Sequence, residues 1–180
     1  MPVFKKGDRK DPANYRPVSL LSICSKILER VVCNQLIAHV APALSPTQHG
    51  FLAGRSCETN LTCLVKELWD AIAGGHQTDV IYTDFSSAFT SVNHSLLLHK
   101  LRRSYHVSGR ALRWFESYLS GREQRVVLNG KTSSGWVRAE TGVPEGSICG
   151  PILFVSFYND VPSHLNSSSS CLMYADHVCG

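Results

Sequence analysis

Apolar and polar residues alternate with helical spacing along much of the chain. Apolar side chains recur every three to four positions over 18–40 and again over 61–72, and this period predicts two amphipathic helices. The stretch between them, 41–56, contains prolines and glycines and predicts a loop. The same pattern predicts shorter helices over 94–104, 109–120 and 148–158. The positions that define the two long helices are Leu20, Cys24, Ile27, Leu28 and Val31, and then Leu61, Leu64, Val65, Leu68, Trp69 and Ile72.

Two short apolar runs predict strands, and each leads into an aspartate. Residues 79–84 are rich in β-branched and aromatic side chains, and they predict a buried strand that ends at Asp84. Residues 171–175 predict a last strand, directly followed by Asp176.

A hairpin is predicted by the strongest short turn signal in the chain. Asn129 and Gly130 lie between the segments 124–128 and 135–138. Helices, strand, helices, hairpin, helix and strand follow one another without an internal repeat. This order favours an α+β fold in which a sheet is layered on helices.

Composition places the chain among globular intracellular proteins. With 180 residues, 43% of them hydrophobic and 18% charged, the chain can build one compact domain and is not disordered. Its seven cysteines are too few for a disulfide scaffold and include no Cys-x-x-Cys pair, so we expect reduced thiols and no zinc site. No apolar run is long enough to cross a membrane and no signal core follows Met1, so we expect a cytoplasmic or nuclear location and no membrane.

Positive charge is concentrated in two stretches of the sequence. Residues 1–16 hold five basic and two acidic side chains, residues 100–125 hold seven basic and two acidic ones, and the remainder is net acidic. Such stretches bind a phosphate backbone by releasing counterions, although solvated helix faces carry similar charge. The candidate nucleic-acid-binding residues are Lys5, Lys6, Arg102, Arg103, Arg110 and Arg113.

The aspartates that end the two predicted strands are candidate metal ligands. If the strands are neighbours, Asp84 and Asp176 meet at one edge of the sheet. Such a pair suits Mg²⁺, which binds through one or two carboxylates together with substrate phosphates, and two such ions promote phosphoryl transfer. From spacing alone, the alternative is that each aspartate is an ordinary turn residue.

Six motifs in a fixed order cover nearly the whole chain. They are Asn14-Tyr-Arg-Pro-Val-Ser-Leu-Leu21, Gln48-His-Gly-Phe51 with Gly54-Arg-Ser56, Tyr82-Thr-Asp-Phe-Ser-Ser-Ala-Phe89, Trp114-Phe-Glu-Ser-Tyr-Leu119, Gly142-Val-Pro-Glu-Gly-Ser147 and Tyr174-Ala-Asp-His177. With these motifs the chain resembles the reverse transcriptases of non-LTR, LINE-type retrotransposons of the jockey-like kind.

The resemblance implies a fragment of a right-hand polymerase, with a fingers-like helical part over about 1–75 and an antiparallel palm sheet packed on helices over about 76–180. It implies an RNA-directed DNA polymerase that uses Mg²⁺, an RNA template, a DNA primer and deoxynucleoside triphosphates. Asp84 and Asp176 would be its catalytic, metal-binding aspartates. Phe89 would lie beneath the sugar, and amides around Ser87 and Ala88 would face the triphosphate. The nucleotide-binding positions that it implies are Arg16, Arg55, Ser87, Ala88, Phe89, Glu145 and Gly146.

Four positions depart from the pattern of the family: Leu52, where relatives commonly have arginine, Thr90, where they commonly have aspartate, and the two that bear most on chemistry, His177 and Glu145. His177 stands where the family has the second aspartate of its Tyr-Ala-Asp-Asp box, and an imidazole is a poor ligand for Mg²⁺. Glu145 replaces the usual glutamine before Gly146 and brings an anion near the expected triphosphate. We therefore expect no measurable polymerase activity with Mg²⁺.

The chain ends three residues after His177, before the thumb of the family. We expect a fragment of a decayed element or a truncated gene product, in which the duplex would be held on one side only. The alternatives to a polymerase domain are a non-catalytic nucleic-acid-binding remnant and a pseudogene product without a selected function.

Overall fold

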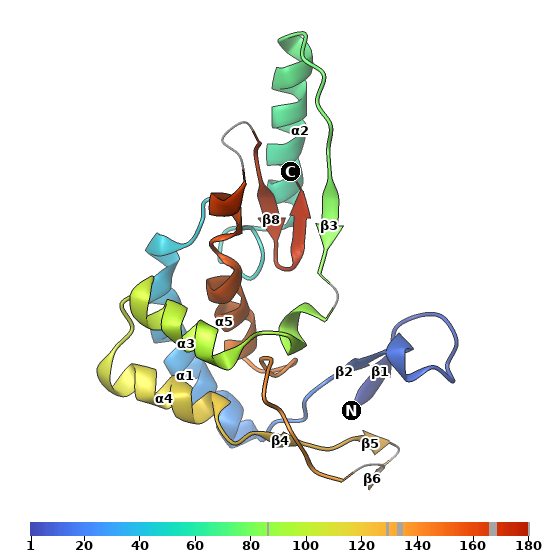
Figure 1. The fold of residues 1–180 in the computed structure, drawn as a ribbon, viewed down its shortest axis with the longest axis vertical. Helices are drawn as coiled ribbons and strands as arrows, with labels where there is room; N and C mark the ends of the chain where they lie inside the picture. The colour runs from blue at the N-terminus through green and yellow to red at the C-terminus, as the bar shows by residue number, and fades with distance from the viewer. Residues whose placement is uncertain (86, 129, 133–134, 166–168, 180) are drawn as a thin grey trace.

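Helices make up most of the regular secondary structure (Figure 1). The computed structural model describes the chain except for residues 86, 129, 133–134, 166–168 and 180. All the helices predicted from the sequence are present, with shifted ends. They are α1 (Ile23–Val40), α2 (Cys57–Ala73), α3 (His94–Arg103), α4 (Gly109–Leu119) and α5 (Cys149–Tyr158), with short 3-10 turns at Pro12–Asn14, Ala41–Ala43, Ala88–Thr90 and Val161–His164.

Side-chain caps fix where three of these helices begin. The Ser22 hydroxyl accepts a hydrogen bond from the backbone N–H of Ser25, so α1 starts several residues later than its apolar pattern predicts. Ser56 and Thr59 form a reciprocal capping box, which adds a turn before the apolar stripe of α2. Asn93 caps α3 by accepting a hydrogen bond from the N–H of Leu96.

The strands are short and antiparallel. The main sheet has the order β3 (Tyr82–Asp84), β9 (His177–Cys179) and β8 (Leu172–Tyr174). The predicted combination of helices and an antiparallel sheet is therefore confirmed. Three two-stranded ladders complete the described strands: β1 (Pro2–Phe4) with β2 (Tyr15–Pro17), β4 (Glu123–Gln124) with β7 (Val137–Arg138), and β5 (Val127–Leu128) with β6 (Lys131–Thr132).

The predicted hairpin forms as two consecutive ladders. Leu128 pairs with Lys131, so the returning strand begins earlier than the predicted 135–138 segment. Gly130 has a φ of 74°, which suits glycine at a tight turn, and Asn129 lies outside the described residues.

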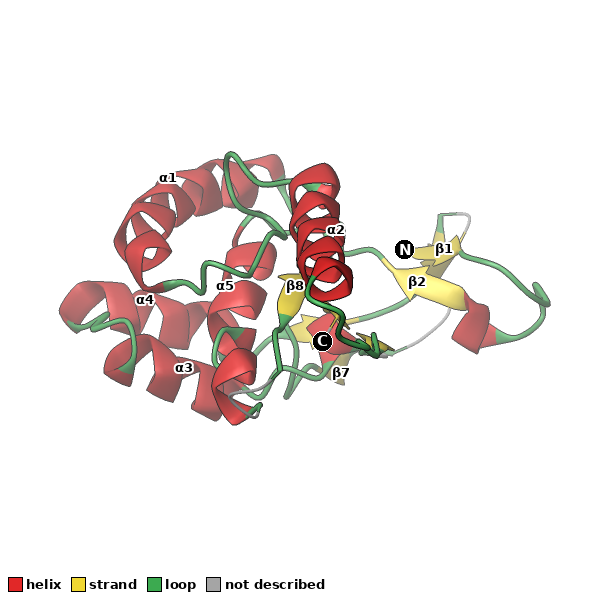
Figure 2. Cartoon of the chain, turned by 90° about the horizontal axis from the view of Figure 1, so that it is seen from above, coloured by secondary structure: helices red, strands yellow, loops and turns green. Residues whose placement is uncertain are grey.

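The core is centred on α5, which is apolar on all sides and almost wholly buried. Helices α1 and α3 pack against it, and α4 packs on α3 (Figure 2). Trp114 and Tyr118 of α4 stack on each other against this core. Helix α2 lies apart from this group and packs on β8 through Leu64 and Leu172 (Figure 1). None of the helices in the described ranges has both the length and the hydropathy needed to cross a bilayer.

The apolar stripe of α1 faces outward, although an amphipathic helix normally buries such a face. Ile27, Leu28 and Val31 are more than half exposed, whereas Glu29 and Cys33 are buried. Helix α2 is similar, because Leu64 is buried but Trp69 is 71% exposed. The buried face of each helix is selected by the element that packs on it, α5 for α1 and β8 for α2.

Strand β3 is exposed, which corrects the prediction of a buried strand. Ile81 and Tyr82 are 65% and 71% exposed. The physical reason is that β3 is an edge strand, whereas α2, the helix that packs on this sheet, makes its contacts with β8 at the opposite edge.

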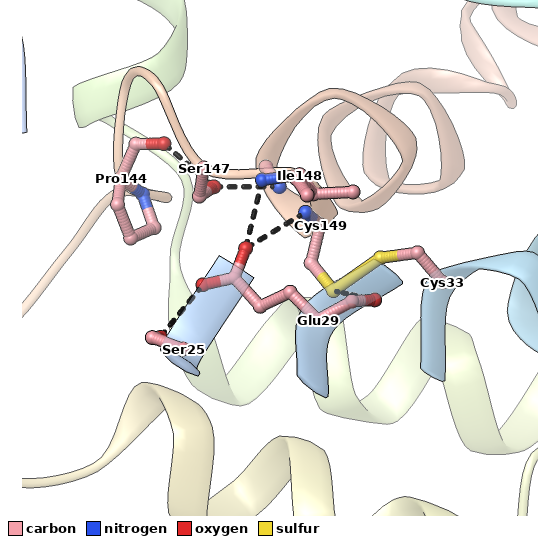
Figure 3. The surroundings of a disulfide bond; sticks show 8 residues. Ser25, Glu29, Cys33, Pro144, Ser147, Ile148 and Cys149 are labelled. Carbon is pink, nitrogen blue, oxygen red and sulfur yellow. Dashed lines mark hydrogen bonds between the residues drawn. A yellow bond between two sulfur atoms is a disulfide. The ribbon is translucent and has the colours of Figure 1, made fainter. Parts of the chain in front are cut away.

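A disulfide between Cys33 and Cys149 joins α1 to the start of α5 (Figure 3). The expectation that all thiols are reduced is therefore wrong for this pair. Beside the disulfide, the buried carboxylate of Glu29 accepts hydrogen bonds from the backbone N–H groups of Ile148 and Cys149, at 2.7 and 3.2 Å (Figure 3). Glu29 therefore satisfies two donors at the N-terminus of α5, where a negative charge is favoured.

Candidate metal centre and its surroundings

Two strands of the main sheet place three metal-ligating side chains together. Asp84 is the last residue of β3 and pairs in register with His177, the first residue of β9. Residues directly opposite each other in an antiparallel pair project from the same face, so these two side chains are neighbours. Asp176 comes one residue earlier, in the tight turn that joins β8 to β9. The turn thus adds a second carboxylate to the pair.

The three side chains lie close enough to share one ion. The Nε2 atom of His177 is 3.7 Å from Oδ1 of Asp84, and its Nδ1 atom is 3.3 Å from Oδ1 of Asp176. One ligand atom from each residue falls within 4.8 Å of the other two. Asp84 and His177 are about two-thirds exposed and Asp176 is about one-quarter exposed, so a hydrated cation can reach them.

The sequence correctly indicated that Asp84 and Asp176 meet, but not which strands bring them together. We expected the strands before the two aspartates to be neighbours, whereas β9 lies between β3 and β8. The carboxylates still meet, because the turn carries Asp176 to the end of β3. There the backbone N–H of Phe85 donates to the carbonyl of Asp176 at 3.4 Å.

Gln48 supports this turn, a role that sequence reasoning missed. Its fully buried carboxamide accepts hydrogen bonds from the N–H groups of Gly50 and Ala175, at 2.7 and 3.0 Å. Ala175 has a φ of 56°, a left-handed conformation that needs such support outside glycine. A side chain at Gly50 would begin 2.2 Å from the nitrogen of Ala175, so only glycine fits there. The Gln48-His-Gly motif was visible in the sequence, but its contact with Tyr-Ala-Asp-His was not.

Arg55 binds the same loop from its other side. Its Nη1 atom donates to the carbonyl oxygens of Ser45 and Pro46, at 3.0 and 2.9 Å, and to that of Gln48. In this structure the guanidinium therefore holds the loop that supports the Asp176 turn. A contact of Arg55 with a nucleotide stays a prediction.

Arg16 and Glu145 form an ion pair. The Nε atom of Arg16 donates to Oε2 of Glu145 at 2.7 Å, and Glu145 is largely buried while Arg16 is half exposed. The backbones also meet, because the N–H of Ser19 donates to the carbonyl of Glu145 at 2.8 Å. The next residue, Gly146, has a φ of 93°, a conformation that strains any other residue. Two expected nucleotide-binding side chains thus engage each other.

The segment after β3 carries the next group of predicted positions. Ser87 has a left-handed φ of 58°, and Ala88 is buried. Phe89 is partly buried, stacks on Phe154 with ring centroids 4.7 Å apart, and meets the edge of Phe51. The aromatic contacts hold Phe89 against the core below the exposed end of β3.

The arginines of the second basic stretch gather at one end of the α3–α4 pair. Arg102 and Arg103 end α3, Arg110 and Arg113 begin α4, and all four are exposed. We call these four residues the arginine patch. Within the described residues none of them forms an ion pair, whereas the nearby Lys100 binds both carboxylate oxygens of Asp160. After β3 the chain passes through the Ala88–Thr90 turn into α3, which runs away from the sheet, so the end of α3 that carries the patch is separated from the end of β3 (Figure 1).

Lys5 and Lys6 lie on the loop that follows β1, and both are exposed. The β1–β2 ladder projects away from the helices (Figure 2). The two groups of predicted nucleic-acid-binding residues are therefore separated in space.

The donor set fits Mg²⁺ only in part. Two carboxylates are suitable ligands for a hard cation that prefers oxygen. The third donor is an imidazole, which belongs to the ligand class of Zn²⁺, Cu²⁺, Fe²⁺ and Ni²⁺. Asp84 and Asp176 could hold Mg²⁺, but the complete set of three does not suit it.

Comparisons with known proteins agree with the order of the motifs. A profile of the family described as reverse transcriptase (RNA-dependent DNA polymerase) matches residues 4–179. The chain is 30% identical, over 98% of its length, to the probable RNA-directed DNA polymerase from transposon X-element of Drosophila melanogaster. It is 32% identical, over 98% of its length, to the probable RNA-directed DNA polymerase from transposon BS. It is also 32% identical, over 86% of its length, to the RNA-directed DNA polymerase from mobile element jockey, and both of these are from the same fly.

The match covers most of this chain but little of its relatives. The chain spans 20% of the X-element and BS proteins and 17% of the jockey protein. The predicted resemblance to jockey-like retrotransposon enzymes is confirmed. The family profile covers residues 4–179, which include the helices and the meeting carboxylates, and on that basis the chain belongs to the reverse transcriptase family.

Proposed function

We propose that this chain is the fingers and palm part of a retrotransposon RNA-directed DNA polymerase whose Mg²⁺-dependent chemistry is impaired. The observation that carries this proposal is the meeting of Asp84, Asp176 and His177 at one end of the β3–β9 pair. Residues 1–75 would form the fingers-like part and residues 76–180 the palm. The proposed partners are an RNA template, a DNA primer and deoxynucleoside triphosphates.

The binding roles follow from position around this centre. Ser87 and Ala88 come shortly after Asp84, so their backbone amides can face a triphosphate whose metal is held by the carboxylates. Phe89 is fixed by its stack on Phe154 and would support the sugar from below. These residues would bind and orient a nucleotide and exclude water from one side of it.

Glu145 would weaken nucleotide binding less by repulsion than by its contact with Arg16. An isolated anion near a triphosphate raises the cost of binding. Here the carboxylate is paired at 2.7 Å, so the charge of Glu145 is largely compensated and that of Arg16 is withdrawn from any phosphate. A nucleotide would compete with Glu145 for the guanidinium of Arg16.

The donor set supports impaired chemistry. Two Mg²⁺ ions and a triphosphate require several carboxylates in one place, and only two lie in this group. His177 supplies a neutral or positive ring where the family pattern has an anion. Binding and positioning of substrates would then persist without efficient nucleotidyl transfer.

A second candidate function is binding of nucleic acid without catalysis. The arginine patch favours it, because four exposed arginines without acidic partners among the described residues would attract a phosphate backbone. The patch is remote from the carboxylates, so this function does not depend on metal.

The decisive experiment grafts residues 1–180 into the complete jockey polymerase in place of the matching segment and measures primer extension with Mg²⁺. We expect no extension by the graft. The variants His177→Asp, Glu145→Gln and their combination then separate the two defects. Recovery with His177→Asp alone locates the defect in metal binding, and recovery that also needs Glu145→Gln locates part of it at the Arg16 pair. Robust extension by the unmodified graft would disprove the impairment.

A further inference from the structure

We infer that Asp84, Asp176 and His177 form a site for one transition-metal ion of the imidazole-binding class, such as Zn²⁺ or Co²⁺, in preference to Mg²⁺. This inference rests on the proposed function only in placing a divalent metal at this end of the sheet. It differs from the expected Mg²⁺ pair in the identity and the number of the ions.

The backbone brings the three donors together before any ion binds. Asp84 and His177 are opposite each other in the β3–β9 register, and the Asp176 turn is held by the buried Gln48. Little chain entropy is then lost on binding, because the ladder and the buried carboxamide already fix the backbone at all three positions.

The distances suit a single small cation. Ligands of Zn²⁺ lie about 2.0–2.2 Å from the metal, so two ligands of one ion are at most about 4.4 Å apart. One ion takes a single ring nitrogen of His177, and the 3.7 Å distance from Nε2 to Asp84 and the 3.3 Å distance from Nδ1 to Asp176 each fall inside that limit for their own nitrogen. The widest separation, up to 4.8 Å, exceeds it by a few tenths of an ångström. Rotation of an exposed carboxylate removes this excess.

The donor types select the metal. Imidazole nitrogen binds Zn²⁺, Co²⁺ and their neighbours far better than Mg²⁺, which demands oxygen ligands in octahedral geometry. Three protein donors with an exposed fourth side are the arrangement of zinc sites that keep an open position. His177 therefore shifts the preference of the site away from Mg²⁺.

The charge of the group sets the number of ions. Two carboxylates supply two negative charges, which balance one dication. A second dication would be held without a compensating anion from this group. One ion per chain is the expected stoichiometry.

The experiment titrates the chain with Co²⁺ and with Mg²⁺, without nucleotide or nucleic acid. Isothermal titration calorimetry measures affinity and stoichiometry, and visible absorption reports nitrogen and oxygen ligation of Co²⁺. We expect one Co²⁺ per chain, displaced by Zn²⁺, and at least about tenfold weaker binding of Mg²⁺. Because a lost outer-shell partner already costs about tenfold or more in metal affinity, loss of a direct ligand in His177→Ala should cost at least as much.

Matched variants keep the result interpretable. His177→Asp should restore preference for Mg²⁺, Asp84→Asn should weaken both metals, and His99→Ala, at an exposed histidine of α3, should change neither. Circular dichroism verifies that each variant folds. Co²⁺ affinity that is unchanged in His177→Ala, or equal affinity for Mg²⁺ and Co²⁺, would overturn the inference. These readouts involve no polymerisation, so they fail or succeed independently of the graft experiment.

Discussion

The side chain of Gln48 holds the backbone of Ala175, the residue directly before Asp176. The Oε1 atom of Gln48 accepts the N–H of Ala175 at 3.0 Å, and its Nε2 atom approaches the carbonyl of the same residue at 3.5 Å. A residue in the loop before α2 thereby fixes the turn that carries a candidate metal ligand.

Gln48→Leu should therefore destabilise the chain and weaken metal binding together. The change leaves the N–H groups of Gly50 and Ala175 buried without an acceptor, which should cost about 2–4 kcal/mol. Urea unfolding measures the loss, and Co²⁺ titration measures the affinity. Gln35→Leu makes the same change at an exposed position of α1 and should alter neither. Unchanged stability of Gln48→Leu would contradict the supporting role.

The hydrogen bonds that Glu29 accepts should contribute more to the free energy of unfolding than its negative charge does. Glu29→Ala removes the acceptor for the N–H groups of Ile148 and Cys149 and should cost about 2–4 kcal/mol of unfolding free energy. Glu29→Gln keeps an oxygen acceptor and loses only the favourable charge at a helix N-terminus, about 0.3–1 kcal/mol. Denaturant unfolding of both variants checks the order. Equal losses would show that the hydrogen bonds at this helix end contribute little.

His49 should make stability fall as the solution becomes acidic. Burial, together with the nearby guanidinium of Arg55, holds the pKa of His49 below the ordinary histidine value of 6.5. The unfolded chain then takes up this proton at a higher pH than the folded chain. Stability from this group is complete above pH 6.5 and is lost as the pH falls toward the lowered pKa.

Thermal unfolding between pH 7.5 and 5 tests this dependence. The midpoint should decline more steeply in the parent chain than in His49→Gln, which cannot gain the proton. His76→Gln, at an exposed position, should keep the parent slope. A parent slope retained in His49→Gln would assign the effect to other groups.

The Cys33–Cys149 disulfide should stabilise the chain by constraining its unfolded state. Its two cysteines are 116 residues apart, and closure of a loop of about that length is worth about 4–5 kcal/mol. Cys33→Ala and Cys149→Ala should each lose this amount, and the double variant should lose little more, since either change breaks the same bond.

Alkylation gives an independent check on this bond. Without reductant, the denatured chain should take up label at five of its seven cysteines, namely Cys24, Cys57, Cys63, Cys171 and Cys179. Reductant should raise the uptake to seven. Full labelling without reductant would show that the bond is not formed in solution.

The arginine patch should control any binding to nucleic acid. Changing Arg102, Arg103, Arg110 and Arg113 together to glutamine should weaken RNA binding and flatten its dependence on salt, because each phosphate contact contributes about 0.7–0.9 to the slope of log affinity against log salt. Filter binding over a range of salt concentrations measures both. Neutralising Lys26 and Arg30, which are exposed on α1, is the matched control. If the fourfold variant keeps both affinity and slope, the patch is only a solvated surface.

Much of the fold and of the candidate site was predicted correctly from the periodicity of apolar residues and from the residues at strand ends. Helical spacing located the helices, because it depends on local geometry that every amphipathic helix shares. The meeting of Asp84 and Asp176 followed from two apolar runs with acidic ends. The strand β9 between them was missed, since three residues show no period.

Buried polar residues and exposed apolar residues could not be predicted from the pattern. Glu29 lies among polar residues of α1, so the pattern predicts that it faces solvent, yet α5 packs over it. The pattern predicts that Ile27 and Leu28 belong to the core, yet no described element covers them. Periodicity defines the faces of a helix, but the partner that packs against it decides which face is buried. The link between Gln48 and Ala175 likewise joins residues far apart in sequence, and no local signal reports it.

The contact between Gly50 and Ala175 has a consequence for genetic selection. A methyl group at position 50 would displace the turn, and the carboxylate of Asp176 would move with it. In a library selected for metal retention, position 50 should therefore tolerate substitution as poorly as the ligands themselves. Substitutions at position 50 and at Asp84 would then score equally poorly, although Gly50 has no side chain that could bind a metal. Only the geometry of the loop explains why Gly50 cannot be replaced.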